Sequence, residues 1–298
     1  MKYGISIIGA GRLGRSLGRR LREQGWKIHA VVTQSKASAQ RAVRSIGGGH
    51  GYGEISASVF SAPVLLVALP DSAVACAVNR LSSFGAENLQ GKIVLHTSGA
   101  LSSEVLQDLR TWGAAAGAIH PLQTFSGIGI PSLDGRMFVV EGDRAAIRVA
   151  RTMARALGGN PVQLAASNKA LYHAAAAISA GQVLALEESA IRIFVSLGIK
   201  RREALKALLP LTRQVLENLE RVGPRAAWTG PLARGDYSVI AMHEDALQPL
   251  PVEYLEAYRA MNRLAARLLA HDTDAVKREL ARISAKSVSK SQVTEVSA

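Results

Sequence analysis

Apolar residues follow different patterns in the two halves of this 298-residue chain. In the first half, continuous runs of Val, Ile, Leu and Ala alternate with stretches of helical spacing. Such runs are typical of parallel strands that helices cover on both faces. The runs predict strands at 4–8, 28–32, 64–69, 93–96, 115–119 and 137–140. We therefore expect an α/β domain with a doubly wound, mainly parallel sheet over residues 1–160.

The second half has helical spacing and little strand character. Long helices are predicted at 167–197, 201–222 and 252–269. Pro210 interrupts the second of these and is expected to end or kink a helix there. We expect an all-α domain over 161–285, followed by a flexible tail over 286–298 because that segment is polar and lacks a core pattern.

The first predicted strand runs into a glycine-rich turn, Gly9-Ala10-Gly11-Arg12-Leu13-Gly14, and a helix follows. Strand, glycines, helix and second strand within 32 residues form the Rossmann fingerprint of dinucleotide-binding proteins. In this motif Gly9 permits the tight turn, Gly11 lets a pyrophosphate approach the backbone, and Gly14 lets the helix pack on the strand. Arg12 and Leu13 lie at the start of the helix, where N–H groups favour an anion.

The end of the second predicted strand indicates which dinucleotide is bound. NAD-specific sites usually carry Asp or Glu there, whereas this chain has Thr33, Ser35 and Lys36. With Arg12, these side chains could hold a 2′-phosphate, so we expect NADP as the cofactor. Arg41 is either a further contact or part of a solvated helix face.

The third strand run ends in Leu69 and Pro70, which this topology places beside the cofactor. Pro70 could line the path of the ribose or nicotinamide. It could equally terminate the strand, with Asp71 and Ser72 capping the helix that follows.

Composition excludes several classes of protein. The N-terminus lacks the pattern of a secretory signal, and no apolar stretch is long enough to span a bilayer, so we expect a cytoplasmic protein without membrane contact. Cys76 is the single cysteine, which excludes an internal disulfide, and we expect it to be a small buried thiol. No cluster of His, Asp or Glu has metal-ligand spacing.

The formal charge of +13 is concentrated in the first half. Residues 1–160 hold 18 of the 36 Lys and Arg but 9 of the 23 Asp and Glu. A basic excess suits nucleic acid, an anionic cofactor or an anionic substrate. Because aromatic residues are few and no nucleic-acid motif is present, we expect no nucleic-acid partner.

Four stretches carry a resemblance to a known family: HTSGAL at 96–101, IHPLQTF at 119–125, LYHAAA at 171–176 and TGPLARGD at 229–236. Together they span both halves of the chain. The chain resembles a two-domain family, a Rossmann-like domain followed by the domain of unknown function DUF2520. That family lies within the superfamily of β-hydroxyacid dehydrogenases, pyrroline-5-carboxylate reductases and prephenate dehydrogenases.

The resemblance implies a set of catalytic residues. Prephenate dehydrogenases carry a serine after one strand and a His-Pro pair after the next, where both meet the substrate. Ser98, with Gly99 beside it, and His120 look like that arrangement. A histidine that titrates near neutral pH suits the general acid or base of hydride transfer. His120 could instead be a structural residue at a strand end.

Helix 167–197 opens with three polar side chains. Hydroxyacid dehydrogenases have a catalytic Lys here, with Asn four residues later; this chain has Lys169 and then His173. Lys169 could be catalytic or a solvated first-turn residue. Tyr172 and His173 are candidate catalytic residues because polar rings on a small-residue helix need partners when buried.

The TGPLARGD segment supplies candidate substrate contacts. By analogy with a glycine-rich loop of pyrroline-5-carboxylate reductases, we expect Thr229 and Arg234 to contact the substrate, with Asp236 orienting the arginine. A purely structural loop held by an Arg-Asp pair is the alternative.

These features favour an NADP-dependent oxidoreductase acting on a small anionic hydroxy, oxo or imino compound in a cleft between the domains. The alternative is a non-catalytic NADP-binding regulator or sensor, since a fold does not guarantee turnover. In a third hypothesis, Tyr172 or water supplies the proton instead of His120. The apolar stretch 174–186 is either a homodimer interface or the core of its own domain, and we expect a homodimer.

Overall fold

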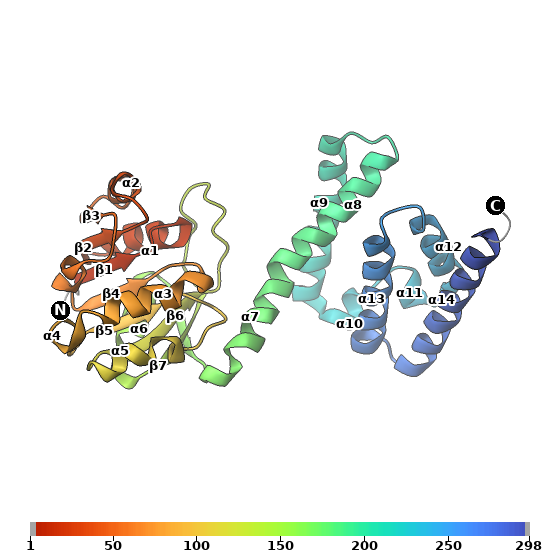
Figure 1. Ribbon diagram of the computed structural model, residues 1–298. Coiled ribbons are helices and arrows are strands. Elements are labelled where there is room, and N and C mark those ends of the chain that lie inside the picture. The colour runs from red at the N-terminus through yellow and green to blue at the C-terminus, as the bar shows by residue number, and fades with distance from the viewer. Residues whose placement is uncertain (1–3, 296–298) are drawn as a thin grey trace. The chain divides into compact units, whose positions relative to one another are not determined.

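The computed structural model describes residues 4–295. It divides into two compact units, Met1–Gln182 and Val183–Ala298 (Figure 1). The first unit holds the sheet. The second is built from helices. The chain passes from one to the other inside the long apolar run of 167–197.

The first unit contains one eight-stranded sheet in the order β3-β2-β1-β4-β5-β6-β7-β8. Neighbouring strands are parallel except β6 and β7, which pair antiparallel. This confirms the doubly wound, mainly parallel class. The strands are β1 (Gly4–Ile8), β2 (Lys27–Val32), β3 (His50–Tyr52), β4 (Val64–Val67), β5 (Ile93–His96), β6 (Ala115–Pro121), β7 (Met137–Gly142) and β8 (Asn160–Gln163).

Helices cover both faces of this sheet, which is why its central strands are continuously apolar. One buried cluster joins the sheet to α1 (Arg12–Glu23), α2 (Lys36–Ile46) and α6 (Arg144–Ala156). A second lies under α3 (Asp71–Ser82) and α5 (Gln107–Thr111). The shorter elements are η1 (Ala57–Ser61), α4 (Gly85–Leu89), η2 (Ser103–Leu106) and η3 (Ala166–Asn168).

The sequence pattern did not indicate β3 and β8. Both lie at the edges of the sheet, are three and four residues long, and include polar residues. An edge strand is held mainly by its backbone hydrogen bonds to one neighbour, so it leaves little apolar pattern. The six predicted strands are all present, with ends shifted by at most two residues.

Cys76 is exposed, so the prediction of a buried thiol is wrong. The buried face of α3 consists of Val74, Ala77, Val78 and Leu81, which follow helical spacing. Cys76 lies between these positions and points away from the sheet.

The long apolar run is one helical segment with a change of geometry. It consists of α7 (Lys169–Ala177), a π-helical turn η4 (Ile178–Gln182) and α8 (Val183–Ser196). In the second unit, α9 (Arg201–Val222) continues through Pro210 without ending. The residues of the TGPLARGD loop form the short helix α11 (Pro231–Arg234), preceded by α10 (Pro224–Ala227).

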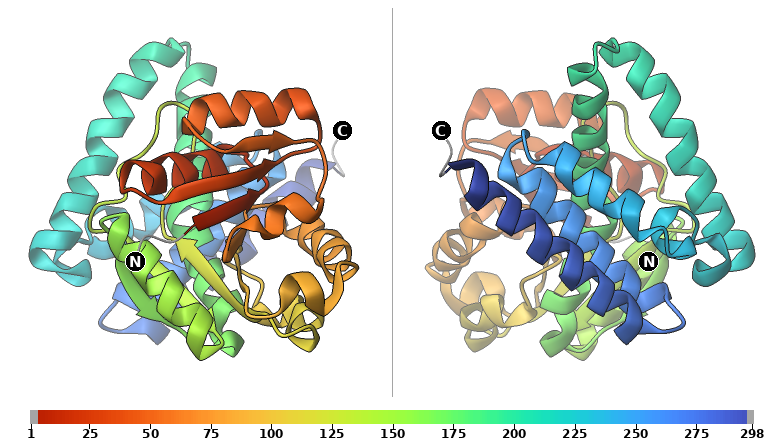
Figure 2. Two further views of the ribbon diagram at one scale, coloured as in Figure 1. Left: turned by 90° about the vertical axis from the view of Figure 1, so that its left-hand side faces the viewer. Right: turned by 90° about the vertical axis from the view of Figure 1, so that its right-hand side faces the viewer.

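The last three helices are α12 (Tyr237–Leu247), α13 (Val252–Leu269) and α14 (Thr273–Glu295). They pack on one another around a small core of Leu232, Ile240, Ala266 and Leu280 (Figure 2). The segment 286–295, where the polar composition predicts a tail, belongs to α14. The remaining tail residues, 296–298, lie outside the described residues.

Candidate active site

The glycine turn between β1 and α1 has the geometry of a dinucleotide cradle. Gly9 adopts a φ of +91°, and a side chain there would overlap the Ala68 carbonyl. A side chain at Gly14 would overlap the Gly9 carbonyl, so α1 approaches β1 closely. At Gly11, by contrast, a Cβ would meet nothing within 4 Å. The turn thus leaves open space at the residue that a pyrophosphate would approach.

A cluster of hydroxyl groups lies where β2 meets α2. Ser35 caps α2 by accepting a hydrogen bond from the Ser38 backbone N–H at 3.2 Å. The Thr33 hydroxyl donates to the Ser35 carbonyl at 3.0 Å, and Ser38 Oγ lies beside both side chains. Lys36 opens the helix. No carboxylate lies between Thr33 and Ser38, as an NADP site requires.

A hollow of about 220 Å³ lies beside the glycine turn. Its walls come from the carboxyl ends of three neighbouring parallel strands, β4, β5 and β6, from the segments that follow them, and from α1 and α7. Ligands of doubly wound folds bind at this edge of the sheet. The lining residues are Leu13, Leu69, Asp71, Thr97, Ser98, Gly99, His120, Pro121, Gln123, Phe125 and His173.

Gly99 lies against two imidazole rings. A Cβ at this position would come within 2.9 Å of His120 Nε2 and closer still to His173 Nδ1. The two rings meet edge to face, with centroids 5.7 Å apart. His173 Nδ1 is buried and has no hydrogen-bond partner. Glycine is the residue type that lets both rings reach the hollow.

His120 and Tyr172 form a hydrogen-bonded pair. His120 Nδ1 and the Tyr172 hydroxyl are 2.8 Å apart. Burial, with help from His173 and Lys169, lowers the pKa of His120 to about 4. Burial also raises the pKa of Tyr172 to about 12. Both groups are therefore neutral at pH 7, which corrects the expectation of a histidine that titrates near neutrality.

Lys169 is fully buried, so the interpretation as a solvated residue is wrong. Its ammonium donates a hydrogen bond of 2.7 Å to the Ser98 carbonyl. Burial lowers the pKa of Lys169 to about 8, although Glu141 and Asp71 act in the opposite direction. Lys169 thus anchors the Ser98–Gly99 segment to α7.

Ser98 itself is held by the backbone that follows it. Its Oγ accepts hydrogen bonds from the N–H groups of Ala100 and Leu101 at 3.2 and 2.9 Å. The Ser98 N–H donates to His96 Nδ1 at 3.2 Å. The Ser98 hydroxyl proton remains free to donate toward the hollow, because these contacts use the oxygen only as an acceptor.

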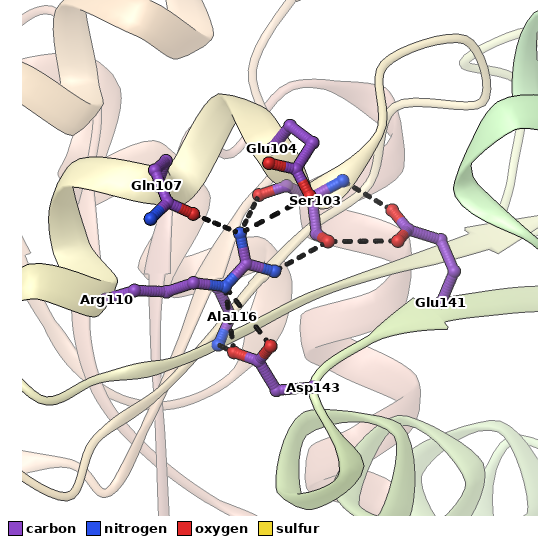
Figure 3. Close-up of polar contacts among 7 residues, drawn as sticks. All are labelled: Ser103, Glu104, Gln107, Arg110, Ala116, Glu141 and Asp143. Carbon is purple, nitrogen blue, oxygen red and sulfur yellow. Dashed lines mark hydrogen bonds and ion pairs between the residues drawn. The ribbon is translucent and has the colours of Figure 1, made fainter.

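A buried polar network fixes the far end of the same loop (Figure 3). Glu141 on β7 is 3% exposed and accepts hydrogen bonds from both the backbone N–H and the hydroxyl of Ser103. Arg110 donates to the Ser103 carbonyl and hydroxyl and pairs with Asp143 at 3.0 Å. The loop from Ser98 to Ser103 is therefore held at both ends, which preorganises Gly99 against the rings.

Two buried histidines are expected to make the protein less stable in acid. Burial lowers the pKa of His96 to about 3 and that of His120 to about 4, whereas unfolded histidine titrates near pH 6.5. The unfolded chain therefore binds more protons as pH falls below about 6.5, and stability is lost from there down to about pH 4. Each histidine is expected to contribute a slope of about 1.4 kcal/mol per pH unit in this window.

Urea unfolding between pH 7 and pH 4.5 measures that slope. We expect His120→Gln to reduce this slope by about 1.4 kcal/mol per pH unit, the contribution of one proton. His50→Gln, which replaces an exposed histidine on β3, is the control. An unchanged slope in His120→Gln would contradict the burial of a neutral His120.

The predicted residues Thr229, Arg234 and Asp236 lie in the second unit. Arg234 pairs with Asp236, with Nε 2.9 Å from Oδ2, as the sequence suggested. Their contact with a substrate stays a prediction. Arg12 lies against Gly127 in the loop between β6 and β7, and its contact with a 2′-phosphate also stays a prediction.

Sequence reasoning missed several residues of this site. Asp71 and Phe125 line the hollow, and His96 and Glu141 support the loop that carries Gly99. Glu141 had a detectable signal, because a carboxylate inside the apolar strand MFVVEG must find partners when buried. Phe125 ends the IHPLQTF stretch, but its position in a loop gives no pattern that points to a role.

Two absences among the described residues bear on the class of site. Among residues 4–295, no group of three or more His, Cys, Asp or Glu is placed to hold a metal ion. In the same range no helix combines the length and apolar character needed to cross a bilayer.

Fold and glycine turn together define a Rossmann-like protein with a helical C-terminal region. Residues 1–121 match the model of the Rossmann-like domain, and residues 136–265 match the Domain of unknown function (DUF2520). The chain therefore carries these two domains in this order, as the resemblance seen in the sequence implied. The sequence matches no curated protein.

Solved structures share this fold. A candidate NADP oxidoreductase of Bacteroides fragilis is 22% identical, with a TM-score of 0.71 over 88% of this chain and 97% of that chain. A protein of Thermotoga maritima is 24% identical, with a TM-score of 0.66 over 87% and 96%. A reductive aminase of Aspergillus terreus, in complex with NADPH and ethyl-5-oxohexanoate, is 19% identical, with a TM-score of 0.66 over 90% and 94%.

Proposed function

We propose that this protein is an NADP-dependent oxidoreductase that transfers hydride between the nicotinamide and a small hydroxy, oxo or imino substrate. The observation that carries the proposal is the hollow at the carboxyl ends of β4, β5 and β6. There His120, His173 and Gly99 lie beside the glycine turn. The likeness to an NADPH-bound reductive aminase supports the same class.

The chain's own residues fit the cofactor. The open space at Gly11 would admit the pyrophosphate, with Gly9, Gly14, Arg12 and Leu13 around it. Thr33, Ser35 and Lys36 would hold the 2′-phosphate, with Ser38 as a contact that the structure adds. Leu69 and Pro70 would lie along the ribose and nicotinamide. NADPH supplies the hydride when bound.

His120 would act as a neutral hydrogen-bond donor. Because Tyr172 keeps its proton, its hydroxyl can donate to His120 Nδ1. Nδ1 is then the acceptor, so the single ring proton of the neutral imidazole is on Nε2. Nε2 lies at Gly99, in the wall of the hollow. From there it would donate to the substrate oxygen or nitrogen as charge develops, and the Ser98 hydroxyl would hold the same atom.

An anionic substrate group would be bound by Arg234, with Asp236 orienting the guanidinium and Thr229 nearby. The residues that line the hollow include one carboxylate, Asp71, and no cation. The reacting carbon would lie at the hollow.

Calorimetric titration with NADPH and NADH tests the cofactor assignment. We expect NADPH to bind more tightly than NADH. Lys36→Ala should weaken NADPH binding about tenfold and leave NADH binding within twofold, because the lysine meets the 2′-phosphate alone. Ser38→Ala should act in the same direction with a smaller effect. Lys27→Ala, an exposed lysine on β2, serves as the matched control. Equal losses for both cofactors in Lys36→Ala would contradict the 2′-phosphate site.

Turnover is tested by NADPH oxidation with a panel of α-keto acids, ketone and amine mixtures and cyclic imines. Consumption of NADPH with one of these compounds, lost in His120→Gln, supports the oxidoreductase. Tight NADPH binding without turnover of any compound would favour the regulatory or sensor alternative.

We propose further that the protein is a homodimer. Leucines on α8 and α9 are largely exposed in the single chain, including Leu184 at 70%, Leu211 at 63% and Leu216 at 55%. Exposed apolar surface on adjacent helices of one unit is typical of a subunit interface.

Light scattering after gel filtration tests the dimer. We expect a dimeric mass for the wild type and a monomeric mass for Leu184→Glu, since a buried unpaired carboxylate opposes association. Ile128→Glu, which replaces an exposed isoleucine in a loop of the first unit, should leave the dimer intact. A monomeric wild type would contradict the proposal.

A further inference from the structure

One face of α1 carries three arginines that the dinucleotide site does not account for in full. Arg12, Arg15 and Arg19 recur at helical spacing and line a second hollow of about 270 Å³. The loop between β6 and β7 forms the opposite wall, beside α1 in Figure 1, and α2 contributes Ser45. The other lining residues are Ser16, Phe125, Gly127, Gly129, Ile130 and Pro131.

The charge of this hollow is only partly compensated. No carboxylate lines it. Arg19 pairs with Glu23 at 3.1 Å, whereas Arg15 Nε donates to the Gly11 carbonyl. Within the part of the chain that the structure describes, neither Arg12 nor Arg15 forms an ion pair. Like charges three and four residues apart destabilise a helix, so an anion held among them would relieve a cost that the free protein carries.

The loop wall suits close contact with a small ligand. At Gly127 a Cβ would come within 2.9 Å of Arg12 Nε, so glycine lets the backbone approach the guanidinium. Gly127 and Gly129 both have positive φ, at +89° and +67°. Phe125 lines this hollow and also the candidate active site. A ligand here would therefore touch a side chain that bounds the reaction site.

We propose that this hollow is an anion-binding site next to the dinucleotide site, carried by Arg15 and Arg19, for a small molecule with a phosphate or diphosphate group. Arg12 is shared with the proposed cofactor site. A guanidinium group can donate two parallel hydrogen bonds to the oxygens of one phosphate, and the hydroxyls of Ser16 and Ser45 can add further donors. The volume lies near the lower end for ligand pockets, about 300 Å³, so the ligand is small. Binding of an anion here does not depend on whether the protein catalyses a reaction.

Titration calorimetry with inorganic pyrophosphate tests this site in full-length protein saturated with NADPH, which fills the dinucleotide site. We expect saturable binding that weakens about tenfold in Arg15→Gln and in Arg19→Gln. Arg148→Gln removes one exposed arginine from α6 and is the matched control, expected to stay within twofold. Circular dichroism confirms that each variant folds. If the protein does not bind NADPH, the same titration is made on the free protein.

Three outcomes would overturn the proposal. Pyrophosphate that binds the free protein but not the NADPH-saturated protein would assign the arginines to the cofactor's own phosphates. Equal weakening in Arg148→Gln would show a diffuse effect of surface charge. An absence of binding to either form would show that the hollow holds no such anion.

Discussion

Gly99→Ala is expected to reduce kcat about 100-fold while NADPH binding stays within twofold. The added methyl group would overlap the rings of His120 and His173, so one or both must leave the wall of the hollow. A displacement of about 1 Å at a reacting group can cost a factor of about 100 in rate. Gly99 is not part of the glycine turn, so the cofactor cradle is unaffected. Steady-state kinetics and calorimetry measure the two quantities separately.

Gly48→Ala is the matched control for this substitution. A Cβ at Gly48 meets its nearest neighbour, the Arg22 side chain, at 3.4 Å, which is ordinary contact. The control should retain both kcat and thermal stability. Wild-type kcat in Gly99→Ala would show that the two rings need not reach this hollow for turnover, and would count against the proposed active site.

His120→Gln is expected to lower kcat by a factor of about 100 to 10,000, the range for loss of a general acid or base. The variant keeps a polar side chain of similar reach but lacks the imidazole, whose Nε2–H would donate to the substrate. Affinity for NADPH should stay within twofold, because His120 lies outside the glycine turn and the hydroxyl cluster at α2. His50→Gln is the control.

Tyr172→Phe separates the proposed mechanism from its alternative. If Tyr172 orients His120, its loss should cost about tenfold, and the double variant should be no slower than His120→Gln alone, because the two residues act as one unit. If Tyr172 itself supplies the proton, Tyr172→Phe would show the larger loss and His120→Gln would retain most of the activity. That second pattern would move the catalytic role to the tyrosine.

The glycine turn and the sheet could be predicted from the sequence because their signals are local. Gly9 has the positive φ of a tight turn and Gly14 brings α1 close to β1, as their spacing implies, since both features depend on backbone conformation within a few residues. The apolar runs indicate the central strands, because strands buried on both faces are mostly apolar. Thr33, Ser35 and Lys36 likewise follow one strand end and open one helix.

The sequence by itself thus determined the Rossmann-like class, the helical second half and the pairing of Arg234 with Asp236. Tertiary structure decided the rest of the site. It brought His120 to Tyr172 across 52 residues and Lys169 to the Ser98 carbonyl across 71, and it buried Glu141 against Ser103. Those contacts depend on which chain segments meet at the edge of the sheet, and burial there sets the protonation of His120 and Lys169. Spacing along the chain shows neither which distant segments meet nor how deeply these polar groups are buried.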